Sequence, residues 1–200
     1  MEKSRYNVKL CYQLKMKPEK QLFFIALLPP EEVQQAANEI KHHFAEVYNS
    51  RAALKSPPHI TLQPPFEWQL ENLSILSQHL AEFVQNHASI PMILDGFAAF
   101  KPRVIYINVL KTPELLTIQK NLMNSLESSL EIIHIPSKNR PFSPHLTVAY
   151  KDLTKANFYQ AWPEFAARPL RFEFIIPKLT LLIHQGKKWE IYQEFLFMDN

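Results

Sequence analysis

One pentapeptide pattern occurs twice in this chain, and it limits the possible folds more than any other feature. Both copies read proline, histidine, an aliphatic residue, threonine and a second aliphatic residue, at 58–62 and 144–148. In a β-strand, residues i and i+2 project from the same face, so each copy sets an imidazole beside a hydroxyl. The aliphatic side chains project from the opposite face. Each copy is therefore predicted to be a strand with one polar face and one face in the core.

The surroundings of the two copies match as well. Each copy follows a helical apolar pattern and a polar loop, and each precedes another helical pattern. Helices are predicted at 31–48, 73–84, 114–130 and around 158–165, and strands at 22–28, 59–66, 90–100, 103–110, 145–150, 170–176, 179–184 and 189–197. This repeated order predicts an α+β fold: a bilobal, duplicated structure of two antiparallel sheets flanked by helices, with the active site in the cleft between the lobes.

The domain boundaries follow from the same patterns. Residues 21–200 are expected to form a single bilobal domain with a pseudo-twofold internal repeat. Residues 6–16 alternate apolar and polar side chains, so residues 1–20 are either an added strand or an N-terminal extension.

Composition excludes several classes of site and partner. The formal net charge of +3 is too small to indicate a surface that wraps nucleic acid. Cys11 is the only cysteine, which excludes an internal disulfide and a cysteine-based zinc site. Gly96 and Gly186 are the only glycines, which excludes a glycine-rich phosphate loop. The longest early apolar run, 22–28, is too short to span a membrane. We expect a soluble, cytoplasmic monomer with no stable protein partner.

Two facing histidines suit displacement at a phosphodiester. One imidazole accepts the proton of the attacking hydroxyl or water, and the other protonates the leaving oxygen. The threonine hydroxyls of the same strand faces would bind the non-bridging oxygens as charge develops. This chemistry needs no metal and no cofactor.

These residues carry a resemblance to a known family. Over 22–31, 58–62 and 142–148 the chain resembles the 2H phosphoesterase superfamily, specifically its 2′-5′ RNA ligase and RNA 2′,3′-cyclic phosphodiesterase group. The resemblance implies catalytic roles for His59 and His145, phosphate binding by Thr61 and Thr147, and RNA ends or cyclic nucleotides as substrates. Family members open 2′,3′-cyclic phosphates to 2′-phosphates, and some reversibly join ends through 2′-5′ linkages. Many bacterial members carry an arginine soon after a motif, which this chain lacks.

Other residues near the two copies are candidates for substrate binding. Arg140 is the best candidate for a cationic contact to phosphate, and Phe66 and Tyr150 could stack on a base. The remaining histidines lack partners at metal-ligand spacing and are interpreted as surface or structural residues: His42, His43, His79, His87, His134 and His184.

Two alternatives differ in class from this hypothesis. A non-catalytic module that binds RNA ends or nucleotides would bind substrate without forming product. A metallohydrolase would lose activity in chelator, and the lack of Asp or Glu near either motif argues against it.

Overall fold

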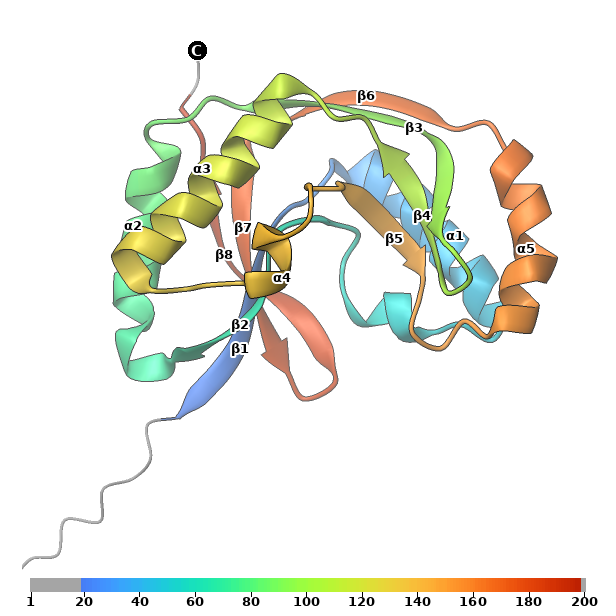
Figure 1. The fold of residues 1–200 in the computed structure, drawn as a ribbon, viewed down its shortest axis with the longest axis horizontal. Coiled ribbons are helices and arrows are strands. Elements are labelled where there is room, and N and C mark those ends of the chain that lie inside the picture. The colour runs from blue at the N-terminus through green and yellow to red at the C-terminus, as the bar shows by residue number, and fades with distance from the viewer. Residues whose placement is uncertain (1–18, 199–200) are drawn as a thin grey trace, which may run out of the picture.

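The computed structural model describes residues 19–198, which form a mixed α+β fold (Figure 1). The strands are β1 (Lys20–Leu27), β2 (Ile60–Gln69), β3 (Ile90–Phe100), β4 (Val104–Val109), β5 (His145–Ala149), β6 (Arg171–Ile176), β7 (Lys178–Gln185) and β8 (Lys188–Leu196). The helices are α1 (Glu31–Val47), α2 (Leu73–Val84), α3 (Pro113–Leu130), α4 (Ile135–Lys138) and α5 (Lys155–Ala167), with 3₁₀ turns η1 (Ala52–Lys55) and η2 (Leu70–Asn72). The strand considered at 6–16 lies outside the described residues.

The α+β class is confirmed, but the strands are not divided into two sheets. They form one eight-stranded sheet in the order β6-β3-β4-β5-β2-β1-β7-β8, in which every pairing is antiparallel. The two halves of this sheet join at β5 and β2, which pair at one position, Ile60 opposite Leu146. The expected two sheets are therefore one sheet with a narrow junction.

Each half of the sheet is covered mainly by one pair of helices. Helices α2 and α3 lie side by side on the half that contains β8 and β2, and α1 and α5 lie on the half that contains β5, β4 and β3 (Figure 1). Helix α1 thus connects β1 and β2 but packs on β5, and α3 connects β4 and β5 but packs on β2. The order strand–helix–strand–helix–strand occurs twice along the chain. That this repeated order arose by an internal duplication stays a prediction.

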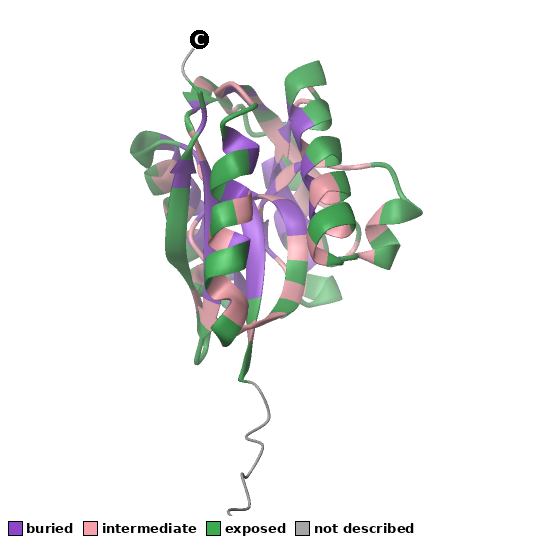
Figure 2. Ribbon diagram, turned by 90° about the vertical axis from the view of Figure 1, so that its left-hand side faces the viewer, coloured by how far each residue is buried: buried purple, intermediate pink, exposed green. Residues whose placement is uncertain are grey.

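The core follows the alternation of residues along the strands. In β1, Phe23, Ile25 and Leu27 belong to the large apolar cluster, whereas Phe24 and Ala26 belong to a small cluster with Leu182. Successive side chains of a strand point to opposite faces, so β1 contributes to both faces of the sheet. Figure 2 shows the buried residues concentrated on the strands and the inner faces of the helices. The small cluster lies on the face that also carries the two histidine motifs.

Local chemistry defines several element boundaries. Thr112 and Thr154 cap α3 and α5, and each side-chain oxygen accepts the backbone N–H three residues later. Such a cap satisfies a donor that the first helical turn leaves free. Gly186 turns the β7–β8 hairpin with φ of 59°, a conformation that glycine adopts without steric cost.

None of the helices in residues 19–198 has the length and apolar character needed to cross a membrane.

Candidate active site

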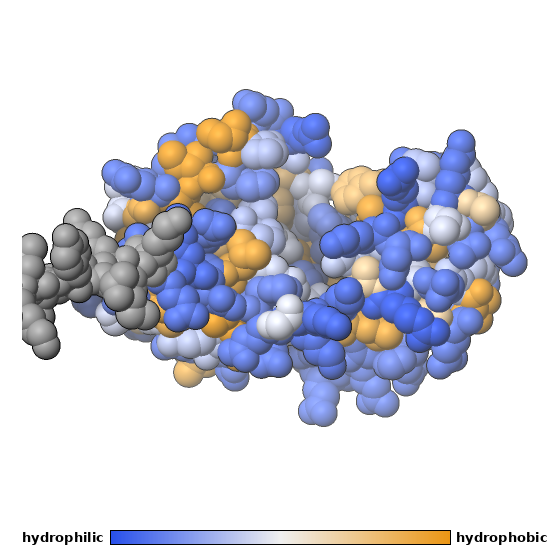
Figure 3. Space-filling model, turned by 90° about the horizontal axis from the view of Figure 1, so that it is seen from below, coloured by the Kyte–Doolittle hydropathy of each residue, from blue (hydrophilic) through white to orange (hydrophobic). Residues whose placement is uncertain are grey.

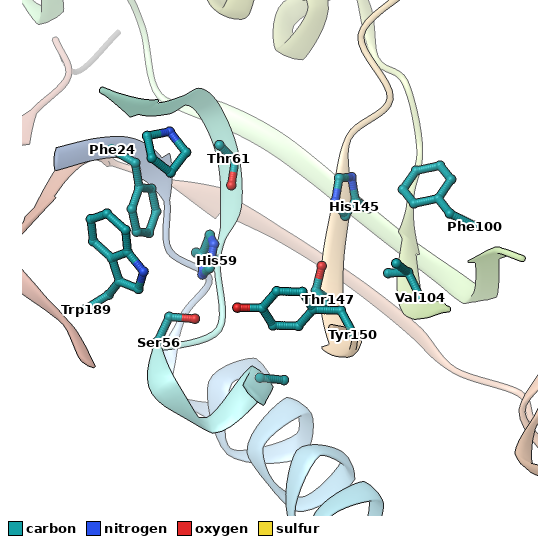
Figure 4. Close-up of a pocket in the computed structure, with 12 residues that line it drawn as sticks. Phe24, Ser56, His59, Thr61, Phe100, Val104, His145, Thr147, Tyr150 and Trp189 are labelled. Carbon is teal, nitrogen blue, oxygen red and sulfur yellow. The ribbon is translucent and has the colours of Figure 1, made fainter. Parts of the chain in front are cut away.

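The junction between β2 and β5 brings the two motifs together. Ile60 lies opposite Leu146 in an antiparallel pair, and in such a pair the residue numbers of opposite positions keep a constant sum. The register therefore sets Thr61 across from His145 and His59 across from Thr147. The intervening residues Ile60 and Leu146 are fully buried. Each histidine thus faces the threonine of the other motif on a common surface, as Figure 4 shows.

The two histidines have the same backbone contact. Nδ1 of His59 lies 2.7 Å from the carbonyl oxygen of Pro57, and Nδ1 of His145 lies 2.7 Å from the carbonyl oxygen of Ser143. A carbonyl oxygen only accepts, so each Nδ1 carries a proton and donates it. In the neutral ring, Nε2 is then the basic nitrogen. The proline that precedes each histidine has a fixed φ, which helps to hold this turned geometry.

A cavity of about 270 Å³ opens above the motifs, and all four motif side chains line it. Aromatic residues form much of the remaining wall: Phe24 and Trp189 beside His59, and Phe100 beyond His145 (Figure 4). Tyr150 extends its ring between the motifs, with its hydroxyl toward Ser56 and His59. Seen from below, the molecular surface is recessed between its two halves and largely hydrophilic (Figure 3). This cavity combines proton-transfer groups with flat apolar surfaces.

Burial sets the ionisation of both imidazoles. Desolvation, helped by the positive charges of Lys41 and His145 and opposed by the hydrogen bond to Pro57, lowers the pKa of His59 to about 4. Desolvation also lowers the pKa of His145, against its hydrogen bond to Ser143. Burial disfavours the charged imidazolium, so both rings are mostly neutral near pH 7 in the free protein.

A buried lysine lies behind the His59 motif. Lys41 of α1 is 1% exposed, and its Nζ donates to the carbonyl oxygen of Ser56 at 3.0 Å. Burial lowers the pKa of Lys41 to about 7. None of the ion pairs formed within 19–198 involves this ammonium group. Lys41 therefore fixes the segment that leads to His59 and adds positive potential there.

A single carboxylate joins the segments that flank the two motifs. Asp152 follows β5, and its Oδ2 accepts the backbone N–H groups of Arg51 and Ala52 at 2.8 and 2.9 Å. Its Oδ1 accepts the hydroxyl of Ser50 at 2.9 Å. Lys151, which precedes it, has φ of 59°, so the chain turns sharply between Tyr150 in the cavity and Asp152. This contact links the loop after His145 to the turn before His59.

The other predicted site residues fall in three places. Tyr150 lines the cavity with the motifs. Arg140 lines a second hollow that shares Thr61 and His145 with the first. Phe66 lines neither hollow: it lies opposite Phe23 in the β1–β2 ladder, is partly buried and packs against the core. Phe66 has the same parity along β2 as the buried Ile60 and Leu62, so strand alternation alone would have placed it on the core face.

Sequence reasoning missed several residues of the site. Phe24 could have been found, because it alternates with the core residues of β1 and so belongs to the other face. Trp189, Phe100 and Lys41 carry no comparable signal, since they reach the site from distant parts of the chain. Across residues 19–198, no three His, Cys, Asp or Glu side chains are grouped as metal ligands would be.

Comparison with known proteins assigns the family. The family model of the 2′-5′ RNA ligase superfamily matches residues 29–188. The chain belongs to this superfamily. Among its relatives are bacterial proteins named "Putative phosphoesterase". The one from Geobacillus kaustophilus is 26% identical over 175 residues, covering 86% of this chain and 94% of that protein. The one from Geobacillus thermodenitrificans is 29% identical over 175 residues, covering 86% of this chain and 94% of that protein.

Solved structures of other bacterial proteins have the same fold as this chain. The protein TT0787 of Thermus thermophilus superposes with a TM-score of 0.65 at 22% identity, covering 88% of this chain and 97% of that one. Escherichia coli LigT, solved in complex with 3′-AMP, gives a TM-score of 0.63 at 19% identity, covering 90% and 99%. Membership of the superfamily supports an enzyme of the 2H phosphoesterase type.

Proposed function

We propose that this protein is a metal-independent phosphodiesterase that acts on 2′,3′-cyclic phosphates or 2′-5′ phosphodiesters of RNA or nucleotides. One observation carries the proposal: each histidine faces the threonine of the other motif across β2 and β5, in a shared cavity. A phosphate between the strands would meet an imidazole and a hydroxyl on each side. The family assignment supports the same chemistry.

The proposed reaction is an acid–base displacement at phosphorus. Nε2 of one histidine accepts a proton from water as the water oxygen bonds to phosphorus. Nε2–H of the other histidine donates a proton to the leaving ribose oxygen as its bond to phosphorus breaks. For a 2′,3′-cyclic phosphate, cleavage of the bond to the 3′ oxygen leaves a 2′-phosphate and a 3′-hydroxyl. A 5′-hydroxyl that attacks in place of water would form a 2′-5′ linkage.

The threonines would stabilise the charge that develops. Thr61 and Thr147 line the cavity with the histidines, and their hydroxyls would donate to the non-bridging oxygens. Donors that are already positioned in a partly dehydrated cavity stabilise a transition state at little reorganisation cost. The aromatic walls offer surfaces on which a base can stack.

Turnover of 2′,3′-cyclic nucleotides in chelator tests the proposal. His59→Ala and His145→Ala should each lower kcat by about 10² to 10⁴-fold, because each removes one proton-transfer group. His42→Ala, on the exposed side of α1, serves as the matched control and should turn over like wild type. Unchanged activity in either motif variant would overturn the proposal. Binding of nucleotide by wild type without product would favour a binding module, and loss of wild-type turnover in chelator would favour a metallohydrolase.

A further inference from the structure

A second hollow adjoins the histidine cavity on its other side. It has a volume of about 310 Å³, and Thr61 and His145 line both hollows. Its remaining walls come from β2, from Gln119 of α3 and from the 134–143 segment. Figure 1 shows α4, within this segment, between α3 and β5. The shared residues therefore lie at a junction with open space on two sides.

Both hollows have a mixed polar and apolar lining, but they differ in their charged and aromatic groups. The first hollow is lined by aromatic rings, among them Phe24, Phe100 and Trp189. The second is lined by Leu62, Phe142 and prolines together with Gln119, His134 and Arg140. Among residues 19–198, Arg140 gives it a cationic group that the first hollow lacks, and no carboxylate lines it. Stacking surfaces suit a nucleobase, whereas a guanidinium and neutral donors suit a sugar and a phosphate.

Arg140 is free to bind an anion, in contrast to its neighbour Lys138. The ammonium group of Lys138 pairs with Glu127 and lines a different pocket. Arg140 takes part in none of the ion pairs found over the described chain. His134, on the same wall, has its Nδ1 2.6 Å from the hydroxyl of Ser137, which orients the ring.

These observations extend the proposed function, on which the following inference rests. We propose that the second hollow binds a second nucleotide, joined to the first through the phosphate at the junction, and that Arg140 contacts that nucleotide's own further phosphate. A cyclic mononucleotide has an organic group on only one side of its phosphate and leaves the second hollow empty. The preferred substrate is then a phosphodiester that joins two nucleosides.

Substrate length tests this inference. Wild-type kcat/KM should be higher for a 2′-5′ linked dinucleotide with a further phosphate on its second nucleoside than for a 2′,3′-cyclic mononucleotide. Arg140→Ala should lower kcat/KM for the dinucleotide about tenfold more than for the mononucleotide, since only the dinucleotide forms the charge-assisted hydrogen bond that the variant loses. Removal of the further phosphate from the dinucleotide should abolish this difference. Lys138→Ala, in the same segment, should change turnover of neither substrate.

The outcomes separate this inference from the proposed function. If wild type hydrolyses the cyclic mononucleotide but Arg140→Ala loses activity equally on both substrates, the second site is disproved and the proposed function stands. If wild type hydrolyses neither substrate, the proposed function fails. Equilibrium binding of the dinucleotide to wild type and to Arg140→Ala then tests whether the second site exists. Equal affinity disproves the site, and about tenfold weaker binding to the variant supports it.

Discussion

The His59 and His145 halves of the site have the same chemical groups in different surroundings. Each histidine donates through Nδ1 to the carbonyl oxygen two residues earlier at 2.7 Å. Burial lowers the pKa of His59 most, and the charge of the buried Lys41 behind it also lowers that pKa. His145 is flanked by Phe100 and Tyr106, with ring centroids at 5.1 and 5.2 Å, and only burial lowers its pKa. Because their surroundings differ, the two histidines can take different proton-transfer roles although their backbone contacts are the same.

The strongest test of this comparison uses the leaving group. Because Lys41 favours a neutral His59, we expect His59 to be the general base and His145 the general acid. A nucleoside p-nitrophenyl phosphodiester has a leaving group that needs no protonation. His145→Ala should lose about 10² to 10⁴-fold on nucleotide substrates and recover most of that loss on the p-nitrophenyl ester. His59→Ala should lose activity on both, and the reverse pattern would exchange the two roles.

The contact that joins the two halves should have a smaller effect. Asp152→Ala removes three hydrogen bonds between the segments that flank the motifs. We expect kcat to fall about tenfold, because small misplacements of catalytic groups are costly. Asp152→Asn keeps an oxygen for the two backbone N–H groups and offers an amide to Ser50, so it should stay near wild type. Equal losses in both variants would show that the charge matters rather than the hydrogen bonds.

The smallest expected effect is a shift of the pH profile. The base His59 must be unprotonated, so kcat/KM should fall as the pH decreases through about 4, the pKa of His59. The acid His145 must be protonated, so kcat/KM should fall as the pH rises through its pKa, which lies below the usual 6.5. Lys41→Met removes a charge that lowers the pKa of His59. The acidic limb should therefore move to higher pH while the alkaline limb stays.

Lys55→Met is the matched control for that shift, because Lys55 is an exposed lysine in the turn before the same motif. It should leave both limbs in place. Thermal unfolding of both variants checks that each remains folded. If the acidic limb does not move in folded Lys41→Met, Lys41 does not cause the difference between the two halves of the site.

Most elements of the fold could be predicted from local patterns. The apolar periodicity of 31–48 and 73–84 predicted α1 and α2 to within one residue at each end. The alternation in both motifs predicted that Ile60 and Leu146 point into the core, and both are fully buried. These features depend on side-chain period, which a single segment of sequence contains.

Other features depend on contacts between distant segments. The single pair Ile60–Leu146 joins what the sequence predicted as two sheets. Packing of α1 carries Lys41 to the His59 motif. No local pattern encodes these contacts, because each arises from the packing of elements that are far apart in the chain.

The sequence by itself determined that two histidine–threonine strands exist and which residues of each strand face the core. That information is local, since strand geometry alone alternates the side chains. Only the tertiary structure decided that the strands meet in antiparallel register, that their surroundings differ and that a second hollow opens beside them. Those properties come from long-range packing, which sets distances and burial and so makes two similar motifs unequal.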